Sequence, residues 1–184
     1  MFVTYDNPPD FKNTMLNSQP LQLFITGGTI DKQYQETTGN LAFSETHLPQ
    51  LLDEGNSTLN IKMQVLMQKD SLEMTEGDRK LINQACSDSK CQRIVITHGT
   101  DTMVETALML LAHFKDENLA RKTIVLTGAM RPFMLQHSDA SFNIGAALLA
   151  AQLAPAGVYI CMNGQLFNAG QVKKDKQAGL FKTL

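Results

Sequence analysis

Short runs of β-branched and other apolar residues recur along this chain, separated by segments whose apolar residues have helical spacing. The runs at residues 93–97 (RIVIT) and 122–127 (KTIVLT) have the composition of strands that are buried on both faces. Similar runs lie at residues 21–25, 60–67 and 157–162. Strands that alternate with helices are typical of a parallel sheet covered by helices, so we predict an α/β fold.

Helices are predicted in the intervening segments, from the spacing of apolar residues and from residues suited to cap a helix. They cover residues 45–53 with Ser44 as a candidate N-cap, 75–87, 102–114, and the alanine-rich 138–153, which begins with a serine. We predict one three-layer domain with helices on both faces of the sheet, of the flavodoxin or Rossmann type, over residues 21–184. Residues 1–20 are interpreted as an irregular lead-in.

Composition limits the classes of function. The chain has 184 residues, 43% of them hydrophobic, and a formal net charge of −2. That charge offers no electrostatic reason to expect nucleic acid or a membrane as partner. The amino terminus does not have the pattern of a signal peptide, and we predict a cytoplasmic protein. Cys86 and Cys91 lack the repeated ligand spacing of a zinc site, so we expect thiols, with no metal and no cofactor.

Polar residues follow three of the predicted strands. The first strand runs into TGGTI (residues 26–30), the next into THGTDT (97–102), and another into TGAMRP (127–132). Ligands of an open α/β sheet bind beyond the carboxyl ends of its strands. The sequence therefore predicts a functional site at this edge of the sheet.

Each of the first two segments also has a purely structural interpretation. Thr29 could present its hydroxyl as a nucleophile, or belong to an ordinary turn after a strand. Asp101 could bind a substrate ammonium group, or cap the helix that follows it. We interpret His98 as a packing or hydrogen-bonding residue at the strand end rather than as a general base.

Taken together, TGGTI and HGTDTM resemble the asparaginase family, meaning the bacterial-type amidohydrolases and not the Ntn-hydrolase kind. GAMRP at residues 128–132, SDA at 138–140 and the following Phe142 and Asn143 add to the resemblance, which extends from Leu21 almost to the carboxyl end. It implies an enzyme that hydrolyses the side-chain amide of asparagine, with glutamine as a second substrate, through a threonine nucleophile.

The resemblance also implies roles for single residues. Thr29 matches the family's threonine nucleophile, and Thr100 and Asp101 match its second threonine and the neighbouring aspartate. Gly28 and Gly99 belong to the same two motifs and are expected to contact substrate. Which threonine attacks first stays open, and we favour Thr29.

Three further positions are carried over by resemblance. Asp70 and Ser71 look like the segment that binds the α-carboxylate and α-amino groups of the substrate, with an ordinary Asp-Ser turn as the alternative. Tyr34 is the candidate for the family's tyrosine on the loop after the first threonine, although it lies closer to Thr29 than is usual. A surface tyrosine without a catalytic part is the alternative.

A lysine completes the implied site. The family's V-x-K motif is matched by Val172, Lys173 and Lys174, with Lys174 in the best register and Lys173 one residue away. Without the resemblance, this stretch would be interpreted as a solvated basic turn. A neutral lysine beside Thr100 and Asp101 would serve as the base of a relay.

Members of the family usually continue into a smaller carboxyl-terminal domain, so the resemblance implies either a single-domain member or a fragment. It also implies a homo-oligomer, most simply a twofold dimer. Two other functions stay open: a module that binds aspartate or asparagine without catalysis, and the amidase subunit of a tRNA-dependent amidotransferase. An assay for ammonia release separates the catalytic from the non-catalytic interpretation.

Overall fold

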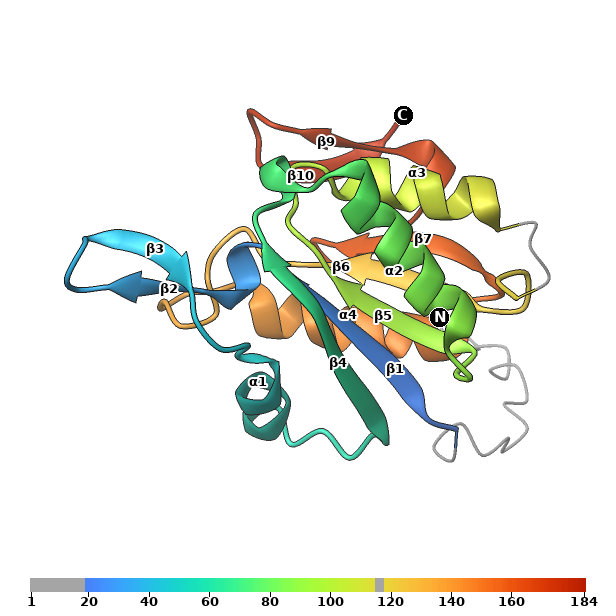
Figure 1. Ribbon diagram of the computed structural model, residues 1–184, viewed down its shortest axis with the longest axis horizontal. Helices are drawn as coiled ribbons and strands as arrows, with labels where there is room; N and C mark the ends of the chain where they lie inside the picture. Colours follow the sequence, from blue (N-terminus) through green and yellow to red (C-terminus); the bar gives the residue numbers. More distant parts are fainter. Residues whose placement is uncertain (1–18, 115–117) are drawn as a thin grey trace, which may run out of the picture.

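The computed structural model describes residues 19–114 and 118–184. A six-stranded sheet lies at its centre, and two two-stranded hairpins stand apart from that sheet (Figure 1). Most of the predicted lead-in, residues 1–18, lies outside the described residues. Among the described helices, none is long and apolar enough to span a bilayer.

The main sheet has the strand order β4-β1-β5-β6-β7-β8. The first five strands pair in parallel, and β8 pairs with β7 in the antiparallel direction. The strands are β1 (Leu21–Gly27), β4 (Ile61–Lys69), β5 (Arg93–Thr97), β6 (Thr123–Thr127), β7 (Gly157–Met162) and β8 (Gln165–Asn168). The predicted α/β fold is confirmed, and the order of the parallel strands is that of flavodoxin-like sheets. The edge strand β8 was not predicted.

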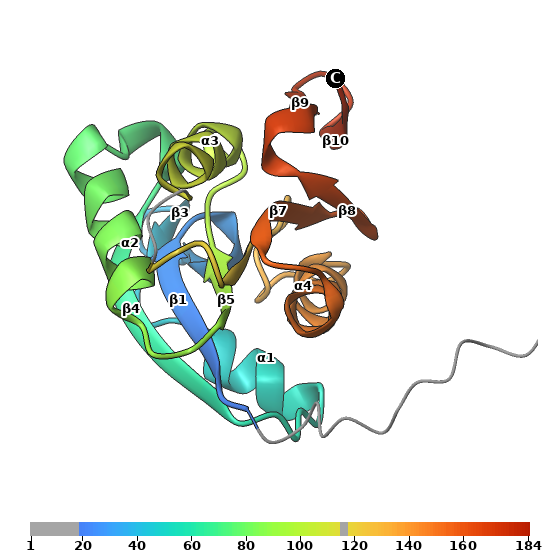
Figure 2. The ribbon, with the colours of Figure 1, turned by 90° about the vertical axis from the view of Figure 1, so that its right-hand side faces the viewer.

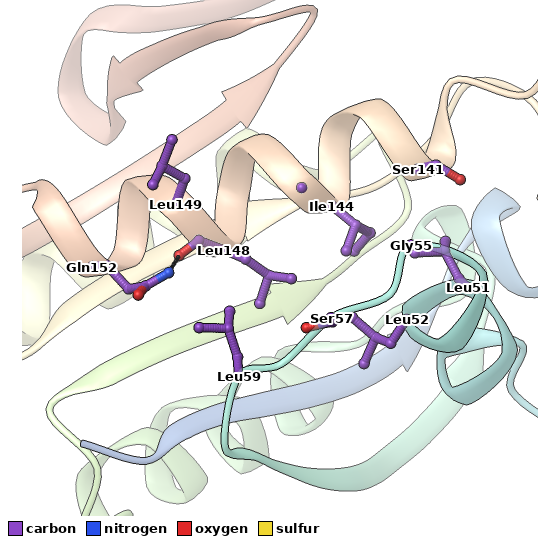
Figure 3. A pocket seen from close by; sticks show the side chains of 11 residues that line it. Leu51, Leu52, Gly55, Ser57, Leu59, Ser141, Ile144, Leu148, Leu149 and Gln152 are labelled. Carbon is purple, nitrogen blue, oxygen red and sulfur yellow. Dashed lines mark hydrogen bonds between the residues drawn. The ribbon is translucent and has the colours of Figure 1, made fainter. Parts of the chain in front are cut away.

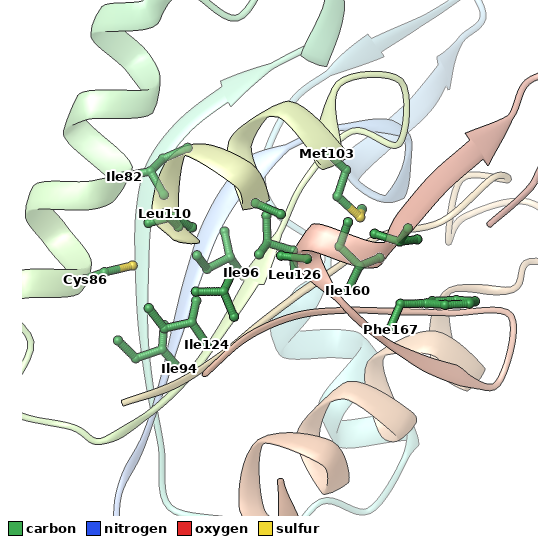
Figure 4. Packing of buried hydrophobic residues seen from close by; sticks show 14 of the residues in the cluster. Ile82, Cys86, Ile94, Ile96, Met103, Leu110, Ile124, Leu126, Ile160 and Phe167 are labelled. Atoms are coloured by element: carbon green, nitrogen blue, oxygen red, sulfur yellow. The ribbon is translucent and has the colours of Figure 1, made fainter. Parts of the chain in front are cut away.

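Helices cover both faces of the sheet, as predicted (Figure 2). They are α1 (Leu48–Glu54), α2 (Glu76–Asp88), α3 (Met103–His113) and α4 (Ala140–Leu153). Along β5, Ile94 and Ile96 pack with α2 and α3, while Val95 packs on the opposite face with α1 and α4. Figure 4 shows the first of these two cores. This alternation explains why the central strands are apolar throughout.

Two predicted helix starts are wrong by a few residues. The first helix begins at Leu48, with His47 and not Ser44 at its N-cap. The reason is the buried carboxylate of Asp31, which accepts hydrogen bonds from the Thr46 hydroxyl and from the His47 backbone N–H, both at 3.0 Å. These bonds hold the chain before Leu48 out of the helix.

The last helix begins at Ala140, with Asp139 at its N-cap, and not at Ser138. The Asp139 carboxylate accepts hydrogen bonds from the backbone N–H groups of Met130 and Arg131 at 3.0 and 3.1 Å. In contrast, the capping box that opens α2 at Thr75 agrees with the predicted threonine start.

Each of the two hairpins begins with a short 3-10 helix. The first comprises η2 (Thr29–Asp31), β2 (Lys32–Gln35) and β3 (Asn40–Phe43), and the second comprises η4 (Ala169–Gln171), β9 (Val172–Asp175) and β10 (Leu180–Thr183). Figure 1 shows β2 and β3 projecting from one end of the molecule, and β9 and β10 lying beside α3. Neither hairpin was predicted, and together they supply two lysines to the site described below.

Candidate active site

The loops after β1 and β5 meet through two glycines. A side chain at Gly28 would bring its Cβ to 2.5 Å from the backbone nitrogen of Gly99. Gly28 also has a φ of 82°, in the region that side chains disfavour. Its backbone N–H donates to the Lys69 carbonyl at 2.9 Å, which adds the end of β4 to the same cluster. Three strand ends therefore converge, and Thr29 and Thr100 each follow one of the touching glycines.

Ser71 packs against the other side of Gly99. A Cβ at Gly99 would lie 2.6 Å from the Cβ and Oγ atoms of Ser71. The Ser71 side chain is buried, and its hydroxyl has no hydrogen-bond partner among the described residues. The Thr102 hydroxyl donates to the Ser71 carbonyl at 2.8 Å, which joins this segment to the start of α3. The predicted substrate-binding residues Ser71 and Gly99 are thus in contact.

Lys174 reaches the same edge from β9. Its Nζ donates to the Thr100 hydroxyl at 2.8 Å and to the Asp101 carboxylate at 2.7 Å. The Lys174 side chain is only 8% exposed, and Thr100 is buried. Asp101 lies before the N-cap residue Thr102 and pairs with Lys174 instead of capping α3. The neighbouring Lys173 is exposed, so Lys174 is the residue brought to Thr100 and Asp101.

Thr29 begins η2 and is half-buried. No hydrogen bond of its hydroxyl is present within the described part of the chain, so that oxygen is available to a ligand. Tyr34 lies opposite Leu41 in the β2–β3 hairpin and is 56% exposed. The described structure joins it by no hydrogen bond to Thr29, Thr100 or Lys174. Of the predicted site residues, Tyr34 is therefore the one that the fold does not bring to the others.

Asp70 directly follows β4, caps the short 3-10 helix η3 (Ser71–Glu73) and is ion-paired. Its Oδ2 atom accepts a hydrogen bond from Lys32 Nζ at 2.5 Å, and its Oδ1 atom accepts one from the backbone N–H of Leu72 at 3.1 Å. The hydrogen bond from Lys32 is the main cause that lowers the Asp70 pKa below its ordinary value. Lys32 was not predicted as a site residue, since no motif signals a pair formed by two segments so far apart in the chain.

His98 is a buried hydrogen-bonding residue, in agreement with the sequence interpretation. Its Nδ1 atom lies 2.8 Å from the Gly99 carbonyl, which can only accept, so Nδ1 carries the proton. The Nε2 atom then accepts from the Thr106 hydroxyl at 2.8 Å. Burial lowers the His98 pKa to about 4. A neutral ring with both nitrogens engaged orients the turn at Gly99 and is a poor general base.

The remaining motif residues have a structural part. Asn143 donates to the Gly128 carbonyl at 3.0 Å and to the Asp139 carboxylate at 2.8 Å. Together with the bonds from Asp139 to Met130 and Arg131, this fixes the turn that follows β6. The segments GAMRP and SDA-x-FN therefore support the loop beside the site.

An apolar groove lies elsewhere, between α1 and α4, with a volume of about 230 Å³ (Figure 3). Leu51, Leu52 and Leu59 face Ile144 and Leu148 across it. None of the predicted site residues lines this groove, and neither does any ionisable side chain. Hydrolysis of an amide needs ionisable side chains, which this groove lacks. We therefore locate the candidate active site at the strand ends.

Comparison with known proteins gives consistent matches. Residues 21–180 match the protein family described as "Asparaginase, N-terminal". The chain is 33% identical to a glutamyl-tRNA(Gln) amidotransferase subunit of Methanococcus vannielii, over 85% of this chain and 38% of that protein. It is 31% identical to the L-asparaginase of Bacillus licheniformis, over 85% of this chain and 50% of that protein.

Among solved structures, the L-asparaginase I of Vibrio cholerae superposes with a TM-score of 0.76 at 28% identity. The match covers 90% of this chain and 51% of that one. The chain thus spans about half the length, or less, of the relatives that it matches.

Proposed function

The chain belongs to the asparaginase family, and on that premise we propose that it hydrolyses the side-chain amide of L-asparagine or a close relative to the acid and ammonia. One observation carries the proposal: the Lys174 ammonium bridges the Thr100 hydroxyl and the Asp101 carboxylate. This lysine is largely buried and lies at the strand ends where the loop of Thr29 also arrives. The proposal is made for this chain alone, which spans about half the length, or less, of its relatives.

In the proposed reaction, the Thr29 hydroxyl attacks the amide carbon. Its proton passes to the leaving nitrogen along the hydrogen bonds that join Thr100, Lys174 and Asp101. Backbone N–H groups of the glycine turns stabilise the negative oxygen of the tetrahedral intermediate. Ammonia leaves, and water cleaves the threonine ester to release the acid and restore the hydroxyl. Tyr34 would take part only if the β2–β3 hairpin moves toward Thr29.

The test is ammonia release by the purified protein with asparagine, glutamine and short amide-bearing peptides. Thr29→Ala and Thr100→Ala should each lower turnover by orders of magnitude, with folding unchanged. Residues that act as a unit are not additive, so the double variant should be little worse than either single one. Thr183→Ala, at an exposed threonine of β10, is the matched control. Near-normal turnover in both single variants would contradict the threonine mechanism.

A second candidate function is the amidase subunit of a tRNA-dependent amidotransferase. It is supported by the 33% identity to the amidotransferase subunit of Methanococcus vannielii. Such a subunit should release ammonia from glutamine, and should do so faster when its partner is present. An asparaginase should prefer asparagine and should need no partner. A non-catalytic binding module would release none from either amide.

We also propose that two copies of this chain pair through the outer face of α4. The helix carries no charged residue, and its apolar residues are spread around its circumference and not confined to one face. Phe142, Leu149 and Leu153 are 56–63% exposed. An uncharged face meets a copy of itself without like-charge repulsion. The mass measured by light scattering should be that of a dimer for the unchanged protein and that of a monomer for Leu149→Asp.

The cytoplasmic location and the domain boundaries stay predictions.

A further inference from the structure

Asp31 is a buried aspartate that the proposed reaction does not use. It ends η2, two residues after Thr29, and it is fully buried. Its Oδ1 atom accepts hydrogen bonds from the Thr46 hydroxyl and from the His47 backbone N–H, each at 3.0 Å. Its Oδ2 atom has no hydrogen-bond partner among the described residues. One carboxylate oxygen therefore joins the turn that carries Thr29 to the chain that enters α1.

The two hydrogen bonds of Asp31 matter more to the fold than its charge does. In the part of the chain that the structure describes, no lysine or arginine forms an ion pair with this carboxylate. Burial raises the pKa of the Asp31 carboxyl, against the hydrogen bonds from His47 and Thr46, which lower it. A buried carboxylate without a cation costs free energy. The neutral amide oxygen of an asparagine could accept the same two hydrogen bonds.

Other contacts hold the beginning and the middle of the turn. The Asp31 backbone N–H donates to the Gly28 carbonyl at 3.2 Å, and the Phe133 backbone N–H donates to the Ile30 carbonyl at 3.2 Å. The hairpin that follows the turn has no buried residue in β2 or β3, so it does not anchor the turn in the core. The end of the turn therefore depends on side chains that bind other segments.

Two such side chains are present, and Asp31 is the stiffer anchor. The side chain of Lys32 reaches Asp70 from a position that is 21% exposed. A long and flexible lysine side chain can keep its ion pair while the backbone shifts. The Asp31 side chain is short and buried, and hydrogen bonds at 3.0 Å tolerate little displacement. The backbone at the end of η2 is thus fixed mainly by Asp31.

Resting on the proposed function, we propose that Asp31 is a positioning residue: by tying η2 to the start of α1, its carboxylate holds the Thr29 hydroxyl where it can attack the amide carbon. In this role Asp31 touches no substrate and transfers no proton. Displacing a reacting group by about 1 Å can lower a rate by about a hundredfold. A side chain outside the chemistry can therefore control turnover.

The first experiment measures kcat and KM for L-asparagine, with each kcat divided by the folded fraction that circular dichroism gives in the assay buffer. Asp31→Ala should lower kcat by about a hundredfold and leave KM nearly unchanged, because a displaced hydroxyl impairs the reaction and not binding. Asp31→Asn should restore kcat nearly to that of the unchanged protein, since its amide oxygen accepts both hydrogen bonds. Thr123→Val is the matched control: it removes two hydrogen bonds at the opposite end of the sheet and should leave kcat unchanged.

Two further results test the role of the hydrogen bonds. If Asp31→Ala does not fold, Thr46→Val removes one of the two donors from the other side and should lower kcat by a smaller factor, again with KM nearly unchanged. If Asp31→Asn is as slow as Asp31→Ala, Asp31 acts through its charge or its proton, and the positioning role is disproved.

Hydrogen exchange gives a readout that needs no turnover. The backbone N–H groups of Asp31 and Lys32 donate within the turn, to the carbonyls of Gly28 and Thr29. They should exchange faster in Asp31→Ala and at an unchanged rate in Asp31→Asn. If no amide releases ammonia but exchange follows Asp31 in this way, the proposed function fails and the hold of Asp31 on the turn stands. If ammonia is released and Asp31→Ala keeps its kcat, the positioning role is disproved and the function stands.

Discussion

The two hairpins have the same local layout and different attachments to the protein. Each consists of a three-residue 3-10 helix, a four-residue strand, a turn and a second four-residue strand. Each also carries a lysine that pairs with an aspartate beyond a parallel strand: Lys32 with Asp70, and Lys174 with Asp101. Since the backbone layout is shared, differences between the pairs come from the side chains around them.

Those side chains differ in burial. In the second hairpin, Val172 and Phe181 are buried in the core on the α3 side of the sheet. In the first, no residue of β2 or β3 is buried. Lys174 is accordingly held by a hairpin that is part of the core, and its exposure is 8% against 21% for Lys32. Core packing thus supports the pair of Lys174 and Asp101, while the pair of Lys32 and Asp70 belongs to a hairpin without buried residues.

The largest expected effect is on the better-packed pair. Lys174→Met should lower turnover by roughly a thousandfold or more, because it removes the base of the relay. Lys173→Met is the matched control and should be nearly silent, since Lys173 is exposed. Steady-state ammonia release measures both. The reverse pattern between the two lysines would move the role to Lys173.

The next effect concerns stability. Phe181→Ala should lower the free energy of unfolding by about 3–5 kcal/mol, as expected for a buried aromatic side chain. Leu41→Ala in the first hairpin should stay within about 0.5 kcal/mol, because Leu41 is exposed. Urea unfolding followed by circular dichroism measures both. Equal losses would contradict the difference in attachment between the two hairpins.

The smallest effect is the pH dependence of the first pair. Lys32 lowers the Asp70 pKa below its ordinary value of 3.8, so the folded state binds a proton there less readily than the unfolded state. The stabilisation is therefore complete above that ordinary value and is lost as the pH falls through the lower folded pKa. Lys32→Met should be less stable than the unchanged protein at neutral pH, and the gap should narrow in acid. If the difference in unfolding free energy between the two proteins stays constant down to about pH 2, the ion pair of Lys32 and Asp70 does not contribute to stability.

Much of the site was predictable because its residues follow strands that are themselves predictable. Thr29 and Thr100 lie in the turns that follow apolar runs, and parallel strands end at one edge of a sheet. Lys174 was placed only through the V-x-K resemblance. The hairpins were missed because their strands are short and mostly exposed, and short polar strands lack the alternation that marks a half-buried strand.

The sequence by itself determined the parallel strands of the sheet, the helices that cover them and the edge where the polar loops meet, because the order of apolar and polar residues along the chain decides which of them are buried. Only the tertiary structure decided which charges meet there. Lys32 lies 38 residues from Asp70 in sequence, and Lys174 lies 73 residues from Asp101. An ion pair depends on a separation of a few ångströms, and the packing of whole elements sets that separation.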